Sequence, residues 1–564
     1  MLHEMSERHV DLVVVGSGAA GMAAALRAHD QDMKVLVVEK SPHYGGSTAM
    51  SGGVCWVPNN STMTRPDSDQ EALDYLLHIT GEHGDAEALE VYVRESQRML
   101  AYLNKNSRVR FDAIEKYADY YAEAPGGKAG GRSMESRPFD GTALGEALRE
   151  LRPPHPQSQI LGKFGITAGM AHSLLTGGWR GTVLMAWCFL GYLLRSFKRR
   201  RYGRDTRLFA GNALAGRLRW SLLDRGVEVA LNTGLESLLE EDGRVVGCRV
   251  SCEGQVETLR ARYGVILAAG GFEKNAKMRA QYGPQPSSTE WSAASPYSQG
   301  DGIRAGADLG AQLDLMDDAW WTPTTVVPKS DLGWVLVVEK NLPGSIFVNH
   351  KAERFCNEAG PYVDAGRALY EDHQRSGGAV PSFMIFDAQF RHRYPVGPVA
   401  PGYAAPDSRT PRRLKEGFMH RSDTLEELAE KLDLPVESLK QTIERFNAQA
   451  QAGEDDDFQR GDTLSDRYYG DPRGHKNPCL GAIAQAPFYA IKVYPGDLGT
   501  KGGVCTDSGA RVRRADGTTV AGLYAAGNNS ASVMARTYPG AGGTIGPALT
   551  FGFLAAESAL ADGS

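Results

Sequence analysis

The strongest constraint on the fold lies near the start of the chain, where a glycine-rich turn joins an apolar run to a helical pattern. Residues 10–15 (VDLVVV) lead into residues 16–21 (GSGAAG), a helix-like run over 22–28 and a second apolar run over 34–38. A strand, turn, helix and strand in this order predict a βαβ unit that binds a dinucleotide, with the phosphates at the helix N-terminus.

Each position of this turn has a chemical reason. Gly16 permits the tight turn, Gly18 lets a pyrophosphate approach the backbone, and Gly21 lets the helix pack closely on the strand. Glu39 lies 18 residues beyond Gly21, where a carboxylate can accept a hydrogen bond from a ribose hydroxyl. The candidate contacts of this unit are Gly16, Gly18, Ala19, Ala20, Gly21 and Glu39.

A second loop rich in glycine, serine and threonine follows at residues 40–58 (KSPHYGGSTAMSGGVCWVP). Taken alone, this loop could be an ordinary surface loop. Its position directly after the nucleotide motif favours a ligand larger than NAD, and we therefore expect FAD. Its candidate contacts are Lys40, Gly46, Ser47, Thr48, Ser51, Gly52 and Gly53.

Two later segments repeat the pattern of a buried strand that ends in small residues. They are residues 263–272 (YGVILAAGGF) and 521–528 (AGLYAAGN), and the second precedes a glycine-rich turn and an apolar helix over 547–560. A helix N-terminus at the flavin would stabilise the negative charge that develops there on reduction. These segments add the candidate cofactor contacts Ala269, Gly270, Gly527, Asn528, Gly543, Ile545 and Pro547.

Because these widely separated segments must converge on one cofactor, the nucleotide domain is predicted to be discontinuous. The expected fold is α/β, with a Rossmann-like FAD-binding domain of the glutathione reductase type over residues 1–319 and 499–564. An α/β catalytic domain over 320–498 is inserted into it. There we expect strands over 334–338, 345–349 and 382–386, one helical stretch over 424–448 capped by Asp423 or Thr424, and a solvated acidic loop over 454–457.

With these segments in view, the chain resembles the fumarate reductase and 3-ketosteroid dehydrogenase flavoprotein superfamily. The match is closest to the 3-ketosteroid Δ1-dehydrogenases, whose pattern includes PSFMIFD (residues 381–387) and DLGTKGG (residues 497–503). The resemblance implies a non-covalent FAD, a 3-ketosteroid substrate and Δ1-dehydrogenation, in which a proton leaves C2 and a hydride leaves C1. Within the family the chain looks most like the branch that acts on cholest-4-en-3-one in cholesterol degradation.

The resemblance also implies a catalytic set. Tyr362 (NEAGPY) is the implied general base and Tyr120 (ADYY) its hydrogen-bonded partner, whereas Tyr538 (RTYPGAG) and the Gly542 amide are the implied donors to the substrate carbonyl. The neighbouring Tyr117 and Tyr121 are expected to be packing residues.

Three alternatives remain open at this point. A 3-ketosteroid Δ4-(5α)-dehydrogenase would use the same cofactor and the same ring. A fumarate reductase-like enzyme is disfavoured because the chain has no convincing equivalent of that group's arginine proton donor, and Asn528 replaces the acidic residue common after the third strand. The third alternative is a flavin-binding scaffold without catalysis.

Residues 151–204 look like an insertion relative to the smaller family members. Residues 182–194 (TVLMAWCFLGYLL) form an uncharged run of 13, too short to span a bilayer, and a basic segment follows. An apolar segment with a basic flank suits a membrane surface, so we expect residues 177–204 to dock peripherally on the cytoplasmic side of a membrane. The alternative is a buried helix with a solvated basic end.

Charge and cysteine content narrow the remaining partners. A net charge of −6 argues against nucleic acid, and the seven scattered cysteines complete no zinc pattern, so no metal site is expected. The polar N-terminus leaves no room for a signal peptide. Since no heme or iron–sulfur motif is present, we expect electrons to leave to an external acceptor such as a quinone.

Overall fold

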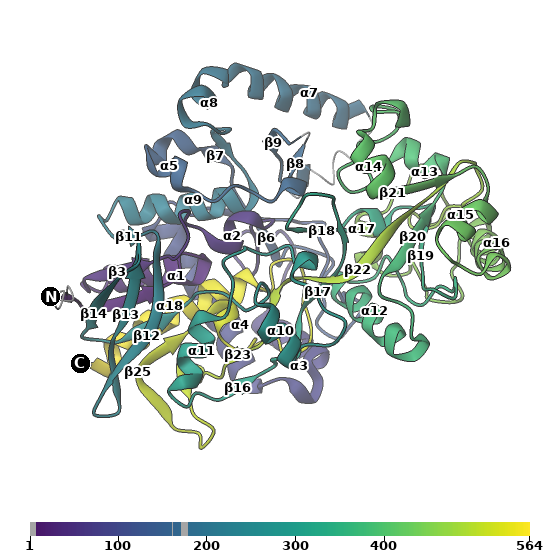
Figure 1. Cartoon of the computed structure of the whole chain (residues 1–564). Coiled ribbons are helices and arrows are strands. Elements are labelled where there is room, and N and C mark those ends of the chain that lie inside the picture. Colours follow the sequence, from purple (N-terminus) through teal and green to yellow (C-terminus); the bar gives the residue numbers. More distant parts are fainter. Residues whose placement is uncertain (1–6, 161, 168, 171–178, 564) are drawn as a thin grey trace.

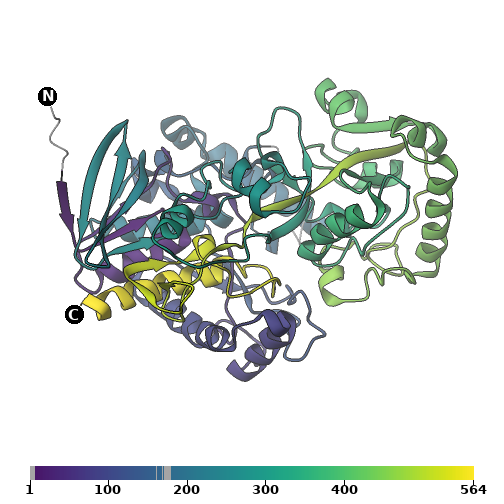
Figure 2. The same ribbon diagram turned by 60° about the horizontal axis from the view of Figure 1, so that its bottom comes forward.

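A computed structural model describes residues 7–160, 162–167, 169–170 and 179–563, with no side-chain placement for 179–182. Two sheets with their own helices form two domains that lie side by side in Figures 1 and 2. The first sheet has ten strands. They are β1 (Glu7–Val10), β14 (Gln255–Ala261), β13 (Arg244–Cys252), β25 (Thr519–Ala525), β15 (Val265–Leu267), β2 (Leu12–Val15), β3 (Val35–Val38) and β11 (Glu228–Ala230) in spatial order, with β12 (Thr233–Glu241) on β13 and β24 (Arg511–Arg513) on β25.

The predicted dinucleotide unit is present as β2, α1 (Ala19–His29) and β3, and β2 and β3 pair in parallel. The expected single strand over 10–15 is wrong, because Asp11 separates β1 from β2. The Asp11 carboxylate accepts a hydrogen bond of 2.8 Å from the Lys34 amide, and β1 pairs with β14 instead of β3. Asp11 therefore divides one apolar run between two parts of the sheet.

The distant segments converge as the sequence predicts. β15 lies between β2 and β25, and all three are parallel, so their carboxyl ends meet at one edge of the sheet. The last helix, α18 (Ile545–Gly563), packs against α1 beneath this edge. The N-terminal and C-terminal parts of the chain thus complete one domain (Figure 1).

The second sheet is antiparallel and spans Ala319 to Thr500, against a predicted domain of 320–498. Its strands are β18 (Gly333–Val335), β17 (Ala319–Val326), β22 (Phe488–Thr500), β20 (Ser382–Phe386) and β19 (Ser345–Val348), with β21 (Met419–Ser422) also on β22. Its helices are α12 (Tyr362–Ser376), α13 (Ala388–Arg393), α14 (Arg412–Gly417), α15 (Leu425–Lys431), α16 (Val436–Ala452) and α17 (Leu464–Tyr468).

Three local predictions in this domain need correction. The helical stretch over 424–448 is two helices, because Asp433 adopts a positive φ of 55° and Pro435 precedes α16; Thr424 caps the first of them. The strand expected over 334–338 ends at Val335. The acidic segment 454–457 is a loop, but Asp455 is buried in an ion pair with Arg354.

Short elements connect the two domains and surround the cofactor loop. In chain order they are α2 (Gly46–Met50), β4 (Val54–Trp56), α3 (Asp69–Thr80), α4 (Ala86–Asn106), β5 (Phe111–Ala113), β6 (Ser133–Ser136), β7 (Phe139–Asp140), α5 (Ala147–Glu150), β8 (Gln159–Ile160), β9 (Phe164–Gly165), β10 (Arg207–Leu208), α9 (Ala210–Leu223), α10 (Ala276–Tyr282), α11 (Asp301–Asp308), β16 (Leu313–Asp314) and β23 (Gly503–Val504).

The predicted insertion forms α7 (Trp179–Leu194) and α8 (Ser196–Tyr202), which lie on the outside of the molecule above α9 and the β8–β9 hairpin (Figure 1). Wherever side chains are described, most large apolar residues of these helices are exposed: Trp187 is 68%, Leu194 77% and Phe197 82% exposed. The alternative of a buried helix is therefore wrong. None of the described helices has the length and apolar character needed to cross a bilayer.

Candidate active site

A cavity of ≈ 460 Å³ lies where the carboxyl edge of the first sheet faces the second domain. Most of the predicted cofactor contacts line it, from all four sequence segments: Gly16, Gly18, Ala19, Ala20, Glu39, Lys40, Gly46, Ser47, Thr48, Ser51, Gly52, Gly53, Ala269, Gly270, Gly527, Asn528 and Ile545. Gly21, Gly543 and Pro547 do not line it.

The cofactor half of the cavity has the geometry expected for a dinucleotide. Gly16 has a φ of +106°, and a Cβ there would lie 2.3 Å from the Ala268 carbonyl oxygen. Gly21 acts in packing, because its Cβ would lie 1.9 Å from the Gly16 carbonyl oxygen. Glu39 accepts hydrogen bonds from the Ser17 amide, the Ser17 hydroxyl and the Ser41 amide, at 3.1, 2.6 and 3.0 Å. A carboxylate held by three donors is oriented toward the cavity that it lines, so the residues fit a ribose and pyrophosphate.

Sequence reasoning missed a further wall of this half, residues 293–301. The Ser295 amide donates to the Ser47 hydroxyl at 3.0 Å, and Asp301 forms an ion pair with Lys40. No glycine motif marks this segment, so no pattern could have identified it. Glu273 was also missed, although it follows the AAGGF motif directly; burial raises its pKa to about 7.

The three predicted catalytic tyrosines meet at the other half. Their ring centroids are 5.3 Å (Tyr120–Tyr362), 5.4 Å (Tyr120–Tyr538) and 5.4 Å (Tyr362–Tyr538) apart. Tyr362 is the first residue of α12, and Tyr538 lies in the loop before α18. Tyr120 stands behind the other two, and its amide donates to the Pro539 carbonyl at 3.1 Å.

Burial controls the acidity of this cluster. It raises the pKa of Tyr362 well above its ordinary value, and the proximity of the Tyr120 hydroxyl opposes that rise. Tyr120 is buried, and its hydroxyl forms no hydrogen bond of normal geometry with any described residue. For Tyr538, burial raises the pKa, while the proximity of Thr544, Tyr362 and the Gly542 amide opposes that rise.

Gly542 is fixed by its surroundings. Its φ is +96°, and a Cβ would lie 2.5 Å from the Cys55 backbone. Its carbonyl accepts a hydrogen bond of 3.1 Å from the Trp56 amide, and its own amide lies close to the Tyr538 hydroxyl. Gly542 and Tyr538 both line the cavity, so the structure brings together the two groups that were predicted to bind the substrate carbonyl.

Lys501, in the DLGTKGG segment, is a second group that the sequence did not reveal. Its buried ammonium donates hydrogen bonds to the carbonyls of Ala535 and Thr537, at 2.9 and 2.7 Å. Its Nζ also lies 4.5 Å from the centroid of the Trp320 ring. The Trp320 and Tyr538 rings pack edge to face, with their centroids 4.7 Å apart. Burial lowers the pKa of Lys501 to about 7. Lys501 thus holds the loop that carries Tyr538.

Three more tyrosines line the cavity: Tyr117, Tyr469 and Tyr297. Tyr117 was predicted to be a packing residue; it stacks on Tyr468 at 4.1 Å but also lines the cavity together with Tyr469. The hydroxyls of Tyr117 and Tyr469 are 3.3 Å apart. Tyr121 points away, and its hydroxyl donates to the Asp364 carboxylate at 3.0 Å.

The insertion supplies the remaining wall. His155 and Gln157 precede β8 and line the cavity, and the Val335 amide of β18 donates to Gln157 Oε1 at 2.8 Å. Burial lowers the pKa of His155 to about 4, so its imidazole is neutral at physiological pH. The described residues 155–160 and 162–167 therefore connect the two domains across the cavity.

A dinucleotide-binding sheet, an inserted α/β domain and a cavity that joins a nucleotide cradle to a cluster of tyrosines define a two-domain flavoprotein oxidoreductase. The FAD binding domain family matches residues 11–545. The 3-oxosteroid 1-dehydrogenase of Mycolicibacterium smegmatis is 44% identical over 98% of this chain and 97% of its own length. The chain belongs to the family of the 3-oxosteroid 1-dehydrogenases, and its cofactor is FAD.

Solved structures agree with this assignment. A 3-ketosteroid Δ1-dehydrogenase from Sterolibacterium denitrificans, in complex with 1,4-androstadiene-3,17-dione, is 46% identical with a TM-score of 0.95, covering 98% of this chain and 100% of that one. A 3-ketosteroid Δ4-(5α)-dehydrogenase from Rhodococcus jostii RHA1 shares the fold at 22% identity and a TM-score of 0.64, covering 99% of this chain and 98% of that one.

Proposed function

We propose that this protein is a 3-oxosteroid 1-dehydrogenase that introduces the C1–C2 double bond into ring A of 3-ketosteroids. The observation that carries the proposal is the meeting of Tyr362, Tyr538 and the Gly542 amide in a cavity continuous with the FAD cradle. The names of the similar proteins support the same activity.

The chemistry follows from the C3 carbonyl. A proton leaves C2, a hydride leaves C1, and the C–H electron pair at C2 becomes the second bond between C1 and C2. The Tyr538 hydroxyl and the Gly542 amide donate hydrogen bonds to the carbonyl oxygen and so stabilise the enolate character that makes the C2 hydrogen acidic. FAD supplies the hydride acceptor when bound.

Tyr362 takes the C2 proton in this proposal. Because its pKa is raised, Tyr362 is almost entirely a neutral phenol at neutral pH. A nearby hydrogen-bond donor is therefore needed to stabilise the tyrosinate that takes the proton. Tyr120 is placed for that role, because its ring lies edge-on to Tyr362 at 5.3 Å and its buried hydroxyl has no other partner of normal geometry among the described residues. Tyr120 also forms the first step of a proton relay away from the substrate.

Anaerobic reduction tests the reaction directly. Purified protein with its flavin spectrum is mixed with androst-4-ene-3,17-dione in the absence of any acceptor. We expect the flavin band to bleach and NMR to show a 1,4-dien-3-one. An unbleached flavin would overturn the reaction while leaving the FAD fold intact.

The same experiment separates the alternatives. A Δ4-(5α)-dehydrogenase would not produce the 1,4-diene from this substrate. A fumarate reductase-like enzyme would oxidise no steroid, and a scaffold would not bleach. The electron acceptor is proposed to be a diffusible quinone, which is tested by adding quinone to the bleached protein and following the return of the flavin band.

We further propose that the preferred substrates carry an aliphatic C17 side chain, as cholest-4-en-3-one does, and that α7 and α8 dock on the cytoplasmic face of a membrane. The exposed apolar face of these helices supports docking, since such a patch marks an interaction surface. The basic flank contributes less than expected, because Arg195 pairs with Asp205, Lys198 pairs with Asp140, and Arg204 is bound to the Leu151 carbonyl and Asn212.

Vesicle sedimentation tests the docking. The double variant Leu194→Asp/Phe197→Asp should lose binding to phosphatidylcholine vesicles, whereas the matched control Leu464→Asp, at an exposed leucine on α17, should keep it. Vesicles with added phosphatidylglycerol should bind only slightly better, because much of the basic flank is paired. Equal sedimentation of the double variant and the wild type would contradict the proposal.

A further inference from the structure

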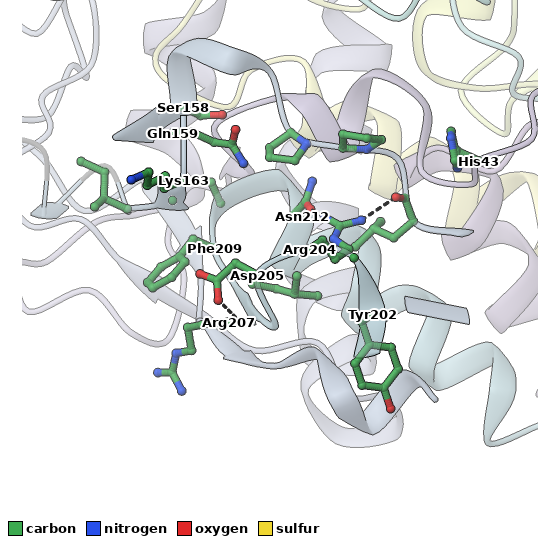
Figure 3. Close-up of a pocket in the computed structure, with 18 of the residues that line it drawn as sticks. His43, Ser158, Gln159, Lys163, Tyr202, Arg204, Asp205, Arg207, Phe209 and Asn212 are labelled. Carbon is green, nitrogen blue, oxygen red and sulfur yellow. Dashed lines mark hydrogen bonds between the residues drawn. The ribbon is translucent and has the colours of Figure 1, made fainter. Parts of the chain in front are cut away.

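A second cavity of ≈ 310 Å³ lies beside the active site, beneath the C-terminal end of α8 (Figure 3). In Figure 3, Ser158 and Gln159 stand on one side of it and Phe209 and Asp205 on the other. Its apolar wall consists of Leu151, Pro153, Pro154, Ile166, Leu208 and Phe209.

The two cavities share part of their wall. Ser158 and Ile166, from the two ends of the β8–β9 hairpin, line both, as do Ser51 of the cofactor loop and Ala210 at the start of α9. One layer of side chains therefore separates the active site from the second cavity.

The shared wall is held at both of its ends. On one side, Gln157 is hydrogen-bonded to β18, whose Val335 lines the active-site cavity. On the other side, Arg152 donates to the Ser41 hydroxyl at 2.6 Å and so fixes the segment to the cofactor domain. The hairpin also contacts α7, through Phe164 and Tyr192, whose ring centroids are 5.8 Å apart. The position of the hairpin is thus set by both domains and by the insertion.

Two charged side chains of the second cavity have close partners. Arg204 donates to the Leu151 carbonyl and to Asn212, and Asp205 pairs with Arg195. Arg149, Lys163 and Arg207 also line the cavity and are exposed at its margin. The buried Nδ1 of His43 has no hydrogen-bond partner among the described residues. Because the remaining wall is largely apolar, the interior suits an uncharged aliphatic chain.

We propose that the second cavity receives the aliphatic C17 side chain of the substrate, with Ile166 and Ser158 at the passage between the two cavities. This inference rests on the proposed function, because it places ring A at Tyr362 and Tyr538. Rings B to D then lie toward the wall formed by β18 and residues 155–158, and the side chain continues past Ile166. Its far end lies under the C-terminal end of α8, beside the exposed apolar residues of α7 and Phe197, where a lipid-dissolved sterol would enter.

Two substrates that differ only at C17 test this directly. Androst-4-ene-3,17-dione has none and cholest-4-en-3-one has a long one, and both are supplied with cyclodextrin so that membranes play no part. The rate of anaerobic flavin bleaching is measured, so that no electron acceptor is involved. In Ile166→Trp the indole should block the passage and lower the bleaching rate with cholest-4-en-3-one by about tenfold or more, since pocket contacts of this size discriminate by that factor. The rate with androst-4-ene-3,17-dione should stay near that of the wild type.

Phe164→Leu is the matched control, because it disturbs the same hairpin at a residue that lines neither cavity; it should keep the wild-type ratio of the two rates. An unchanged ratio in Ile166→Trp, or an equal loss with both substrates, would overturn the inference. An effect confined to reoxidation by quinone would also overturn it and would make the cavity the acceptor site. If the wild type bleaches with neither steroid, the proposed function fails instead.

Discussion

The two ends of the active-site cavity differ in how firmly their backbone is held. At the ring A end, Tyr538 is buried and Tyr362 is partly buried, and the backbone around Tyr538 is held by Lys501 and by the close approach of Gly542 to Cys55. At the far end, the wall is a short hairpin that leads into helices with an exposed apolar face. The difference separates two tasks: a rigid end aligns the reacting atoms, and an inserted end determines which molecules reach them.

Tyr362→Phe should have the largest effect of any change at the rigid end. Removing the proposed base should lower the rate of flavin bleaching by about 10²–10⁴-fold with every steroid, the usual contribution of a positioned acid or base. Stopped-flow bleaching measures the rate. Tyr370→Phe on the same helix is the matched control, since Tyr370 is buried but does not line the cavity. Wild-type bleaching in Tyr362→Phe would contradict the assignment of the base.

Tyr538→Phe should lower the same rate by about 10²–10³-fold, the usual result of losing one oxyanion-hole donor. The absorbance of bound 1,4-androstadiene-3,17-dione should shift back toward its value in water, because the carbonyl is less polarised. Thr544→Val removes only the partner of Tyr538, 3.1 Å away, and should have a smaller effect. An unchanged spectrum in Tyr538→Phe would place the carbonyl elsewhere.

The pH dependence should also report the ring A end. Because burial raises the pKa of Tyr362 above its ordinary value, the tyrosinate fraction is small at neutral pH, and kcat/KM should still be rising at pH 10. In Tyr120→Phe the rise should move to higher pH, because Tyr120 lowers the pKa of Tyr362. Circular dichroism at each pH controls for unfolding. A profile that levels off below pH 8 would exclude an unassisted tyrosine base.

Lys501→Met tests whether the loop that carries Tyr538 is held from behind. Two buried carbonyls lose their donor, so the free energy of unfolding should fall by about 1–3 kcal/mol for each carbonyl left unsatisfied, as measured in urea. The spectral shift of the bound dienone should weaken, because Tyr538 is less firmly placed. Lys501→Arg keeps the charge and should restore part of that shift. Loss of stability with a normal spectral shift would limit Lys501 to a structural role.

The smallest effect is expected at the inserted end. Without vesicles, Leu194→Asp/Phe197→Asp should bleach with androst-4-ene-3,17-dione at the wild-type rate, because neither residue lines either cavity. A slower rate would show that α7 and α8 influence the chemistry, and the separation of the two ends would fail.

Some of this architecture could be predicted from local patterns. The turn over residues 16–21 and the apolar strands have periodicities and glycine positions that few other folds use, so most of the cofactor half was predictable. Residues 293–301 and Glu273, which also line it, were not. The boundaries were less predictable: Asp11 and Pro435 each divide an element whose apolar pattern is continuous.

By itself, the sequence determined the fold class, the cofactor and the identity of the tyrosines, because strand, turn and helix signals are local and the family motifs surround each tyrosine. Only the tertiary structure decided which distant groups support them. Lys501 beneath Trp320, residues 293–301 beside the cofactor loop and the wall shared by two cavities all depend on contacts between segments far apart in the chain. No local pattern encodes such contacts, since burial and hydrogen-bond partners are fixed only when the two domains pack together.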